Sequence, residues 1–186
     1  NAMFGLVRDE YDRADRFYGG TEFGSIPFTK HTLFSAGADD SWGNNRHTSF
    51  RHLSYPKNIT DMEDVIPFQA VFEWLYKVIN TSNMIISRAE SEGIDWQGSS
   101  AEEDLANKNS VIANARLVRA WAYRHLTYSF GAVPLSTEEI TGSNYRTDWE
   151  RTPVADIRSV MEQDLLYAID ILPMRTVTNT TPSQAV

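Results

Sequence analysis

The stretch that decides the fold is residues 115–135, which read ARLVRAWAYRHLTYSFGAVPL. Apolar residues recur every three or four positions up to Phe130, as they do on one face of a helix. Gly131 and Pro134 then end the helix, because glycine adopts the αL conformation of a helix cap and proline cannot continue the hydrogen-bond ladder. Upstream, Ser100 and Glu103 have capping-box spacing. We therefore predict a long helix from Ser100 to Phe130, with one face formed by Leu105, Lys108, Ile112, Ala115, Arg119, Ala122, Leu126 and Phe130.

The same periodicity predicts three further helices, at 4–18, 60–93 and 152–173. Capping residues support two of them: Thr60 stands three residues before Glu63, and Thr152 precedes Pro153 as an N-cap before a proline at the first helical position. The buried face of the last helix is expected to be Val154, Ile157, Met161, Leu165, Ala168 and Leu172.

The fold class predicted from this pattern is all-α, with stacked helical hairpins and long irregular loops. The short connection between 60–93 and 100–130 predicts antiparallel neighbours, and alanines at 113, 115, 120 and 122 allow a partner helix to approach closely. Only residues 25–34 could hold a short strand.

Composition excludes several classes of function. The chain has 186 residues, 25 acidic and 17 basic side chains, and a net charge of -8, so nucleic acid and anionic membrane surfaces are unfavourable partners. It contains no cysteine and no apolar run of about 18 residues, so we expect neither thiolate chemistry nor a bilayer-spanning helix. Residues 1–3, Asn-Ala-Met, are typical of a tag remnant and are set aside.

Motifs for catalysis and for cofactor or metal binding are missing from the sequence. It has no Gly-x-Ser-x-Gly elbow and no phosphate-binding glycine loop, and its four histidines do not follow a metal-binding pattern. Oxygen ligands for calcium are available at Asp39, Asp40, Asn44 and Asn45, but their order does not fit an EF-hand and favours ordinary turns. We therefore predict no nucleophile-elbow or phosphate-loop chemistry, no cofactor and no metal. Glycoside hydrolysis needs a pair of carboxylates, and the 25 acidic residues single out no pair, so it remains the least favoured alternative.

Arg119 lies on the apolar face of the 100–130 helix, where an unpaired charge would be costly. A buried partner is therefore expected, and Asp164 is a candidate. Such a pair is expected to be structural rather than catalytic.

The most informative loop reads DDSWGNNR at 39–46. Trp42 offers a flat apolar face, and Asp39, Asp40, Asn44, Asn45 and Arg46 offer hydrogen-bonding groups around it. A pyranose ring stacks its C–H face on indole while its hydroxyls bond to such side chains, so the loop fits a neutral glycan. The alternative is that Trp42 only anchors its loop to the helices.

Three blocks of sequence resemble the SusD/RagB family, whose members are surface lipoproteins that capture nutrients for glycan import. The first block is Trp74-Leu75-Tyr76 followed by Asn80 and Asn83, similar to the first tetratricopeptide-like helix of the family. The second is 115–135, in which an Arg-Ala-aromatic helix runs into Phe-Gly-x-Val-Pro-Leu. The third is Arg151-Thr152-Pro153 with the helix that follows, up to Pro173.

The resemblance implies tetratricopeptide-like hairpins, noncatalytic binding of an oligosaccharide or polysaccharide, and delivery to a TonB-dependent, SusC-like transporter. It also implies an outer-membrane, cell-surface location through a lipid anchor upstream. Because members of the family are longer, residues 1–186 are interpreted as a single SusD-like N-terminal helical domain of a longer chain. Trp42 and Asn45 resemble the aromatic-plus-amide arrangement with which some members hold starch. The alternative function is a tetratricopeptide-like scaffold that binds a peptide or protein.

Overall fold

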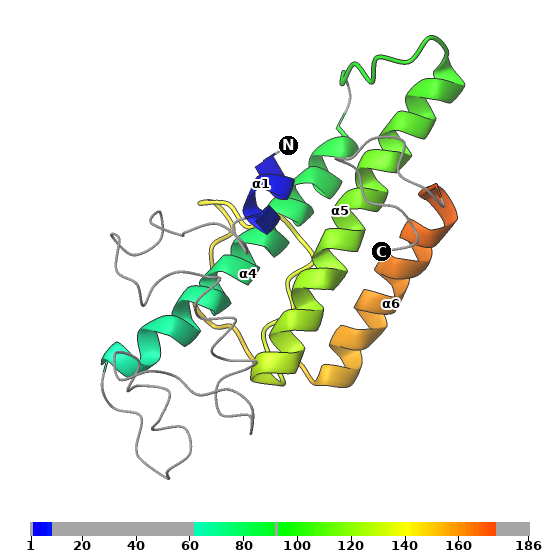
Figure 1. Cartoon of the computed structure of the whole chain (residues 1–186). Helices are drawn as coiled ribbons and strands as arrows, with labels where there is room; N and C mark the ends of the chain where they lie inside the picture. The colour runs from blue at the N-terminus through cyan, green and yellow to red at the C-terminus, as the bar shows by residue number, and fades with distance from the viewer. Residues whose placement is uncertain (1, 9–61, 92, 174–186) are drawn as a thin grey trace. The chain divides into compact units, whose positions relative to one another are not determined.

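The computed structural model describes residues 2–8, 62–91 and 93–173 (Figure 1). The chain divides into two compact units, Asn1–Trp74 and Leu75–Val186. The described helices are α1 (Ala2–Arg8), α4 (Met62–Ala89), α5 (Ala101–Phe130) and α6 (Val154–Ile171). The prediction of an all-α fold is thus confirmed, and no described helix is long and apolar enough to cross a membrane. The strand considered at 25–34 lies outside the described residues.

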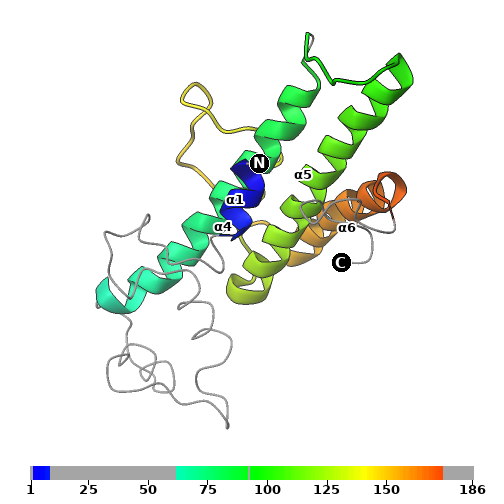
Figure 2. The ribbon, with the colours of Figure 1, turned by 45° about the horizontal axis from the view of Figure 1, so that its top comes forward.

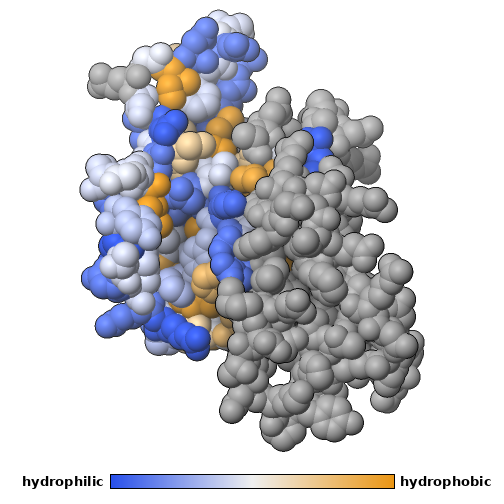
Figure 3. All heavy atoms as spheres, turned by 90° about the vertical axis from the view of Figure 1, so that its left-hand side faces the viewer, coloured by the Kyte–Doolittle hydropathy of each residue, from blue (hydrophilic) through white to orange (hydrophobic). Residues whose placement is uncertain are grey.

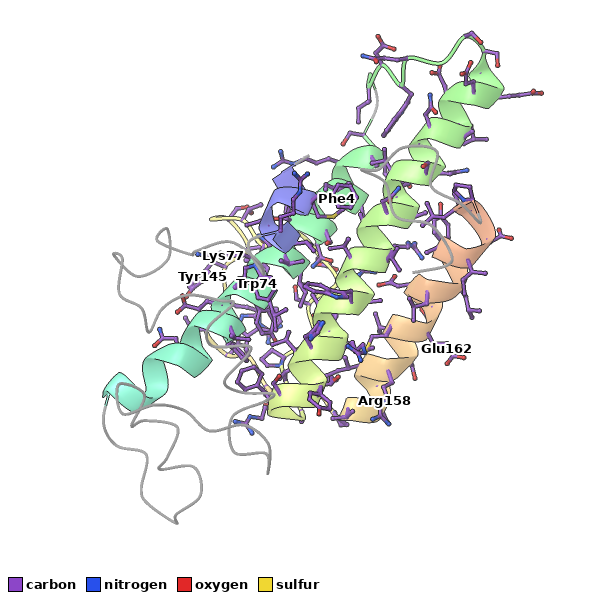
Figure 4. All side chains as sticks on the ribbon, viewed as in Figure 1. Phe4, Trp74, Lys77, Tyr145, Arg158 and Glu162 are labelled. Atoms are coloured by element: carbon purple, nitrogen blue, oxygen red, sulfur yellow. The ribbon has the colours of Figure 1, made fainter. Side chains whose placement is uncertain are left out.

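In the first unit, α1 and the beginning of α4 share a small core. Met3, set aside as a tag remnant in the sequence, is 4% exposed, and Trp74 is 2% exposed. The indole Nε1 of Trp74 donates a hydrogen bond to the carbonyl oxygen of Leu6 at 2.7 Å. Figure 4 labels Trp74 on α4 and Phe4 of α1. The helix predicted from residue 4 is confirmed as far as Arg8, and its continuation to Tyr18 lies outside the described residues.

Helix α5 begins and ends where the sequence predicts. The Oγ of Ser100 accepts the backbone N–H of Glu103 at 3.3 Å, and the Glu103 carboxylate accepts the backbone N–H of Ser99 at 2.7 Å. Gly131 ends the helix with φ 70° and ψ -128°, and its N–H donates to the Thr127 carbonyl at 3.1 Å. The αL conformation expected for Gly131 is wrong, because ψ is negative; a positive φ nevertheless explains why glycine stands there.

The predicted cap of α6 is wrong by one residue. Pro153 precedes the helix, and its carbonyl accepts the N–H groups of Asp156 at 3.0 Å and Ile157 at 3.2 Å. Thr152 instead donates its backbone N–H to the Val133 carbonyl at 3.0 Å, in an antiparallel bridge. This bridge closes the long connection between α5 and α6 at its base.

The predicted helix faces are confirmed in their middle parts and wrong at two positions. On α6, Leu165 is 38% exposed, whereas the neighbouring Asp164 is 2% exposed. On α5, Leu105 near the N-terminus is 57% exposed. Most of the remaining predicted positions in the two helices are buried, namely Ile112, Ala115, Arg119, Ala122, Leu126, Ile157, Ala168 and Leu172.

In the second unit, α4 from Leu75 onward, α5 and α6 run antiparallel in turn, side by side in Figures 1 and 2. The alanine-rich face of α5 meets α6, where Ala113 packs with Ala168 and Leu172. Small side chains at this contact let the two backbones approach closely. Side chains of α4 form hydrogen bonds with the segment that connects α5 to α6.

Candidate functional site

The loop predicted to bind glycan lies outside the described residues. Asp39, Asp40, Trp42, Asn44, Asn45 and Arg46 therefore remain predictions from the sequence. In the described part of the chain, the polar groups gather in the second unit, around the connection between α5 and α6.

A buried ion pair forms the centre of this unit. Arg119 on α5 donates from Nε to Asp164 Oδ2 and from Nη2 to Asp164 Oδ1, both at 2.7 Å. The two residues are 6% and 2% exposed. A guanidinium fork matches a carboxylate in this bidentate geometry, which satisfies both charges away from water. The buried partner expected for Arg119 is therefore confirmed as Asp164.

The ion pair is connected to α4 and to the connecting segment by Asn83. The third nitrogen of Arg119, Nη1, donates to Asn83 Oδ1 at 2.8 Å and to the Thr137 carbonyl at 3.3 Å. The amide nitrogen of Asn83 donates to the carbonyls of Ser136 at 3.1 Å and Glu138 at 3.0 Å. One buried network therefore joins all three helices to residues 136–138.

Tyr123 fixes the same segment from α5. Its hydroxyl accepts the backbone N–H of Ser136 at 2.7 Å and donates to the Ser136 carbonyl at 3.0 Å. Burial raises the pKa of Tyr123 to about 12. The hydroxyl thus keeps the proton that it donates.

A row of polar side chains on α4 forms hydrogen bonds with both ends of the segment from Pro134 to Ile140. The Tyr76 hydroxyl donates to the Pro134 carbonyl at 2.6 Å. Asn80 exchanges two hydrogen bonds with the backbone of Ile140, at 2.7 and 3.1 Å. Burial raises the pKa of the Tyr76 hydroxyl, with a smaller contribution from Tyr123. Tyr76, Asn80 and Asn83 lie at positions i, i+4 and i+7 of the helix, so they share one face.

The hydrogen bonds between α4 and the α5–α6 connection were not predicted from the sequence. The signal was present, because a tyrosine and two asparagines recur at helical spacing beside the buried apolar residues Val78 and Ile79. Asparagine is a poor helix former, so its repetition on one face indicates hydrogen bonding to another part of the chain.

Beyond Ile140 the connection continues as a projecting loop, which we define as residues 141–149 (Figure 2). Its first turn is closed by Asn144, which accepts the Thr141 N–H at 2.6 Å and donates to the Glu139 carbonyl at 2.8 Å. Tyr145 follows and is 71% exposed.

The second half of the projecting loop is organised by Arg146. Its Nε donates to Asp148 Oδ1 at 2.8 Å, and its Nη2 donates to the Asp148 carbonyl at 3.2 Å. The guanidinium carbon lies 4.8 Å from the centre of the Trp149 ring. Hydrogen bonds from Arg146 lower the pKa of the Asp148 carboxyl, so this group is ionised at neutral pH. The loop therefore presents an aromatic ring, a cation and an anion together.

The described residues offer fixed donors, acceptors and exposed rings for binding. Both oxygens of the buried Asp164 accept a hydrogen bond from Arg119, so this carboxylate has a structural partner in the helix core. In the part of the chain that the structure describes, no three acidic, histidine or cysteine side chains are grouped to hold a metal ion.

Comparison with known proteins shows where the chain belongs. A family model described as "Starch-binding associating with outer membrane", named SusD-like, matches residues 17–186. A SusD-like protein P2 of Formosa agariphila is 28% identical over 128 residues, which cover 69% of this chain and 24% of that protein. The chain thus spans about a quarter of the length of this curated relative.

Solved structures agree on the fold. A SusD homologue from Bacteroides thetaiotaomicron is 26% identical over 66% of this chain and 24% of its own, with a TM-score of 0.52. A SusD-like carbohydrate-binding protein from Bacteroides fragilis is 18% identical over 98% of this chain and 33% of its own, with a TM-score of 0.64. A structure solved with a xylogluco-oligosaccharide is 21% identical over 95% of this chain and 31% of its own, with a TM-score of 0.63.

The family match extends over most of the chain and includes every described residue from α4 to the end of α6. The matched range also contains all three blocks of sequence that resemble the SusD/RagB family. This chain belongs to the SusD-like family of starch-binding proteins that associate with the outer membrane.

Proposed function

We propose that this chain is part of a noncatalytic glycan-binding protein of the outer membrane, which captures an oligosaccharide and delivers it to a TonB-dependent, SusC-like transporter. The observation that carries the proposal is the family match over residues 17–186. A structural neighbour solved with a xylogluco-oligosaccharide supports the ligand class. A lipid anchor upstream of this sequence would hold the protein at the cell surface.

The binding contacts are proposed to come from the 39–46 loop. Trp42 supplies a ring on which the apolar face of a sugar can stack, and Asn44, Asn45 and Arg46 supply hydrogen bonds to its hydroxyls, with Asp39 and Asp40 beside them. Such contacts need no net charge on the ligand.

The family match also supports the noncatalytic part of the proposal. Hydrolysis of a glycoside requires two carboxyl groups across a cleft, one of which acts as an acid. The one fully buried carboxylate in the described part of the chain, Asp164, is neutralised by Arg119. Its contacts give it a structural role between α5 and α6.

The test is a glycan array with the natural full-length protein, followed by calorimetry with maltoheptaose and a xylogluco-oligosaccharide. Trp42→Ala is compared with Trp96→Ala. The control variant lacks a different loop tryptophan. The hydrogen bond from Asn107 goes to the backbone carbonyl of residue 96, so alanine at this position retains it. Released reducing ends are measured in parallel.

We expect binding without hydrolysis, weakened in Trp42→Ala and retained in Trp96→Ala. Equal binding by wild type and Trp42→Ala would contradict the proposed site. Absence of binding to every glycan would contradict the function and favour a peptide-binding scaffold, and released sugar would contradict the noncatalytic role.

A further inference from the structure

We propose that the projecting loop, residues 141–149, is a second carbohydrate-contact surface, in which the Tyr145 ring and the Arg146–Asp148 pair bind one unit of a neutral glycan. This inference rests on the proposed function and adds a site that is separate in sequence from the 39–46 loop.

The first observation is the exposure of Tyr145. Its side chain is 71% exposed, although tyrosine usually covers part of its ring against neighbouring residues. Figure 4 places Tyr145 on the α4 side of the second unit, whereas Arg158 and Glu162 mark α6 on the other side. An aromatic ring that is held in water is available to stack on the apolar face of a sugar.

The second observation is that the loop is ordered before any ligand binds. Its base is closed by the bridge between Val133 and Thr152, and its first turn is closed by Asn144. On the α4 side, Asn80 holds Ile140 through two hydrogen bonds. Because these contacts fix the loop in advance, a ligand does not have to supply the free energy of ordering it.

The third observation concerns the donors and acceptors in the same loop as Tyr145. Asp148 accepts hydrogen bonds from the Nε and Nη2 of Arg146, and the Trp149 ring contacts one face of the guanidinium. Its Nη1 makes no hydrogen bond to any described residue, and the side chain is 52% exposed. Asp148 is 78% exposed. A donor next to an acceptor suits two adjacent sugar hydroxyls, one of which accepts while the other donates.

Charge selects a neutral sugar rather than an acidic one. Between 141 and 151 the two basic residues, Arg146 and Arg151, are balanced by Asp148 and Glu150. The chain as a whole carries a net charge of -8, which disfavours anionic ligands.

The surface on this side also favours a sugar over a protein partner. Figure 3 looks at the molecule from the α4 side, and its described part shows blue and pale residues with orange ones only scattered between them. Protein interfaces usually have a contiguous apolar centre, whereas sugars bind through isolated rings and polar groups.

The experiment measures binding of maltoheptaose and a xylogluco-oligosaccharide to the full-length protein by calorimetry, together with the strongest glycan found on the array. Three variants are compared: Tyr145→Ala removes the ring, Tyr145→Phe keeps it, and Thr147→Ala changes an exposed residue of the same loop. Because these side chains are exposed, the thermal midpoints should match that of the wild type, which shows that each variant folds.

We expect Tyr145→Ala to bind about three- to tenfold more weakly, the range given by the loss of one aromatic contact, while Tyr145→Phe and Thr147→Ala bind like the wild type. If the wild type binds glycan and Tyr145→Ala binds equally well, the second surface is refuted and the proposed function stands. If the wild type binds no glycan, the proposed function fails and this inference fails with it.

Discussion

At the scale of single residues, the main question is why a charge lies in the apolar centre of a helix. Arg119 and Asp164 are nearly inaccessible to water, so each loses its hydration on folding. The bidentate bond offsets this cost, and the remaining donor of Arg119 reaches Asn83 and the Thr137 carbonyl. We infer that the pair fixes the α5–α6 connection in one position, which an apolar pair of equal volume would not do.

The first prediction tests this interpretation with a double-mutant cycle. Arg119→Met should lower the free energy of unfolding by about 3–5 kcal/mol, because it removes both hydrogen bonds to the buried Asp164 and leaves only Arg116, 4.0 Å away, as a charged neighbour. Asp164→Leu should be comparably destabilising. The double variant should lose clearly less than the sum of the two, as measured by urea denaturation. Additive losses would show that the two charges do not depend on each other.

The second prediction concerns the stability of the protein at high pH. The pKa of Tyr123 rises from 10.0 in the unfolded chain to about 12 in the folded protein, so the folded state holds this proton more tightly. The resulting stabilisation is complete below pH 10.0 and is lost as the pH rises through about 12.

Urea denaturation of wild type and Tyr123→Phe at a series of pH values checks this prediction. Phenylalanine cannot accept the Ser136 N–H, so the variant should be less stable at neutral pH. The free energy of unfolding of the variant should fall less steeply between pH 10 and 12 than that of the wild type. Tyr76 on α4 is then the remaining tyrosine with a raised pKa that bonds to the α5–α6 connection, among the described residues. Parallel curves would refute a role for Tyr123 ionisation.

At the scale of the elements, the helices were predictable and the connection between them was not. Periodicity and caps located α5 because Ser100, Gly131 and Pro134 act on their own backbone neighbours. The faces of α5 and α6 were wrong at Leu105 and Leu165, because burial at a helix end or edge depends on which helices cover it. Asn80 and Asn83 bond to carbonyls more than 50 residues away. Their spacing indicates that they bond to another part of the chain, but it does not identify those carbonyls.

The third prediction is argued from the end of α5. Gly131 has a φ of 70°, which a side chain rarely adopts, although a Cβ there would meet no atom within 4 Å. Gly131→Ala should therefore destabilise the protein by about 1–3 kcal/mol through backbone strain alone. Gly142→Ala is the matched control, because it also has open space and no positive φ, and thermal unfolding should leave it within about 0.5 kcal/mol of the wild type. Equal losses in both variants would contradict the strain argument.

At the scale of the whole molecule, the net charge of the chain restricts the class of ligand that it can attract. A protein with a net charge of -8 repels anions at long range but exerts no force on a neutral sugar before contact. The contacts proposed for 39–46 and for the projecting loop are both short-range stacking and hydrogen bonds. An uncharged polysaccharide is therefore the class of ligand that agrees with both proposed sites.

The fourth prediction follows for the dependence of binding on salt. Added salt screens interactions between exposed charges that are farther apart than about 10 Å at 0.1 M and about 3 Å at 1 M, but it does not weaken stacking or hydrogen bonds to neutral hydroxyls. Binding of maltoheptaose or a xylogluco-oligosaccharide should therefore have the same affinity at about 0.05 M and about 0.5 M sodium chloride, as calorimetry can measure. Glucose oligomers bearing carboxylates serve as the comparison, and they should bind more weakly at low salt because the protein repels them. Tighter binding of the acidic oligomers at low salt would mean that the arginines, rather than the rings, select the ligand.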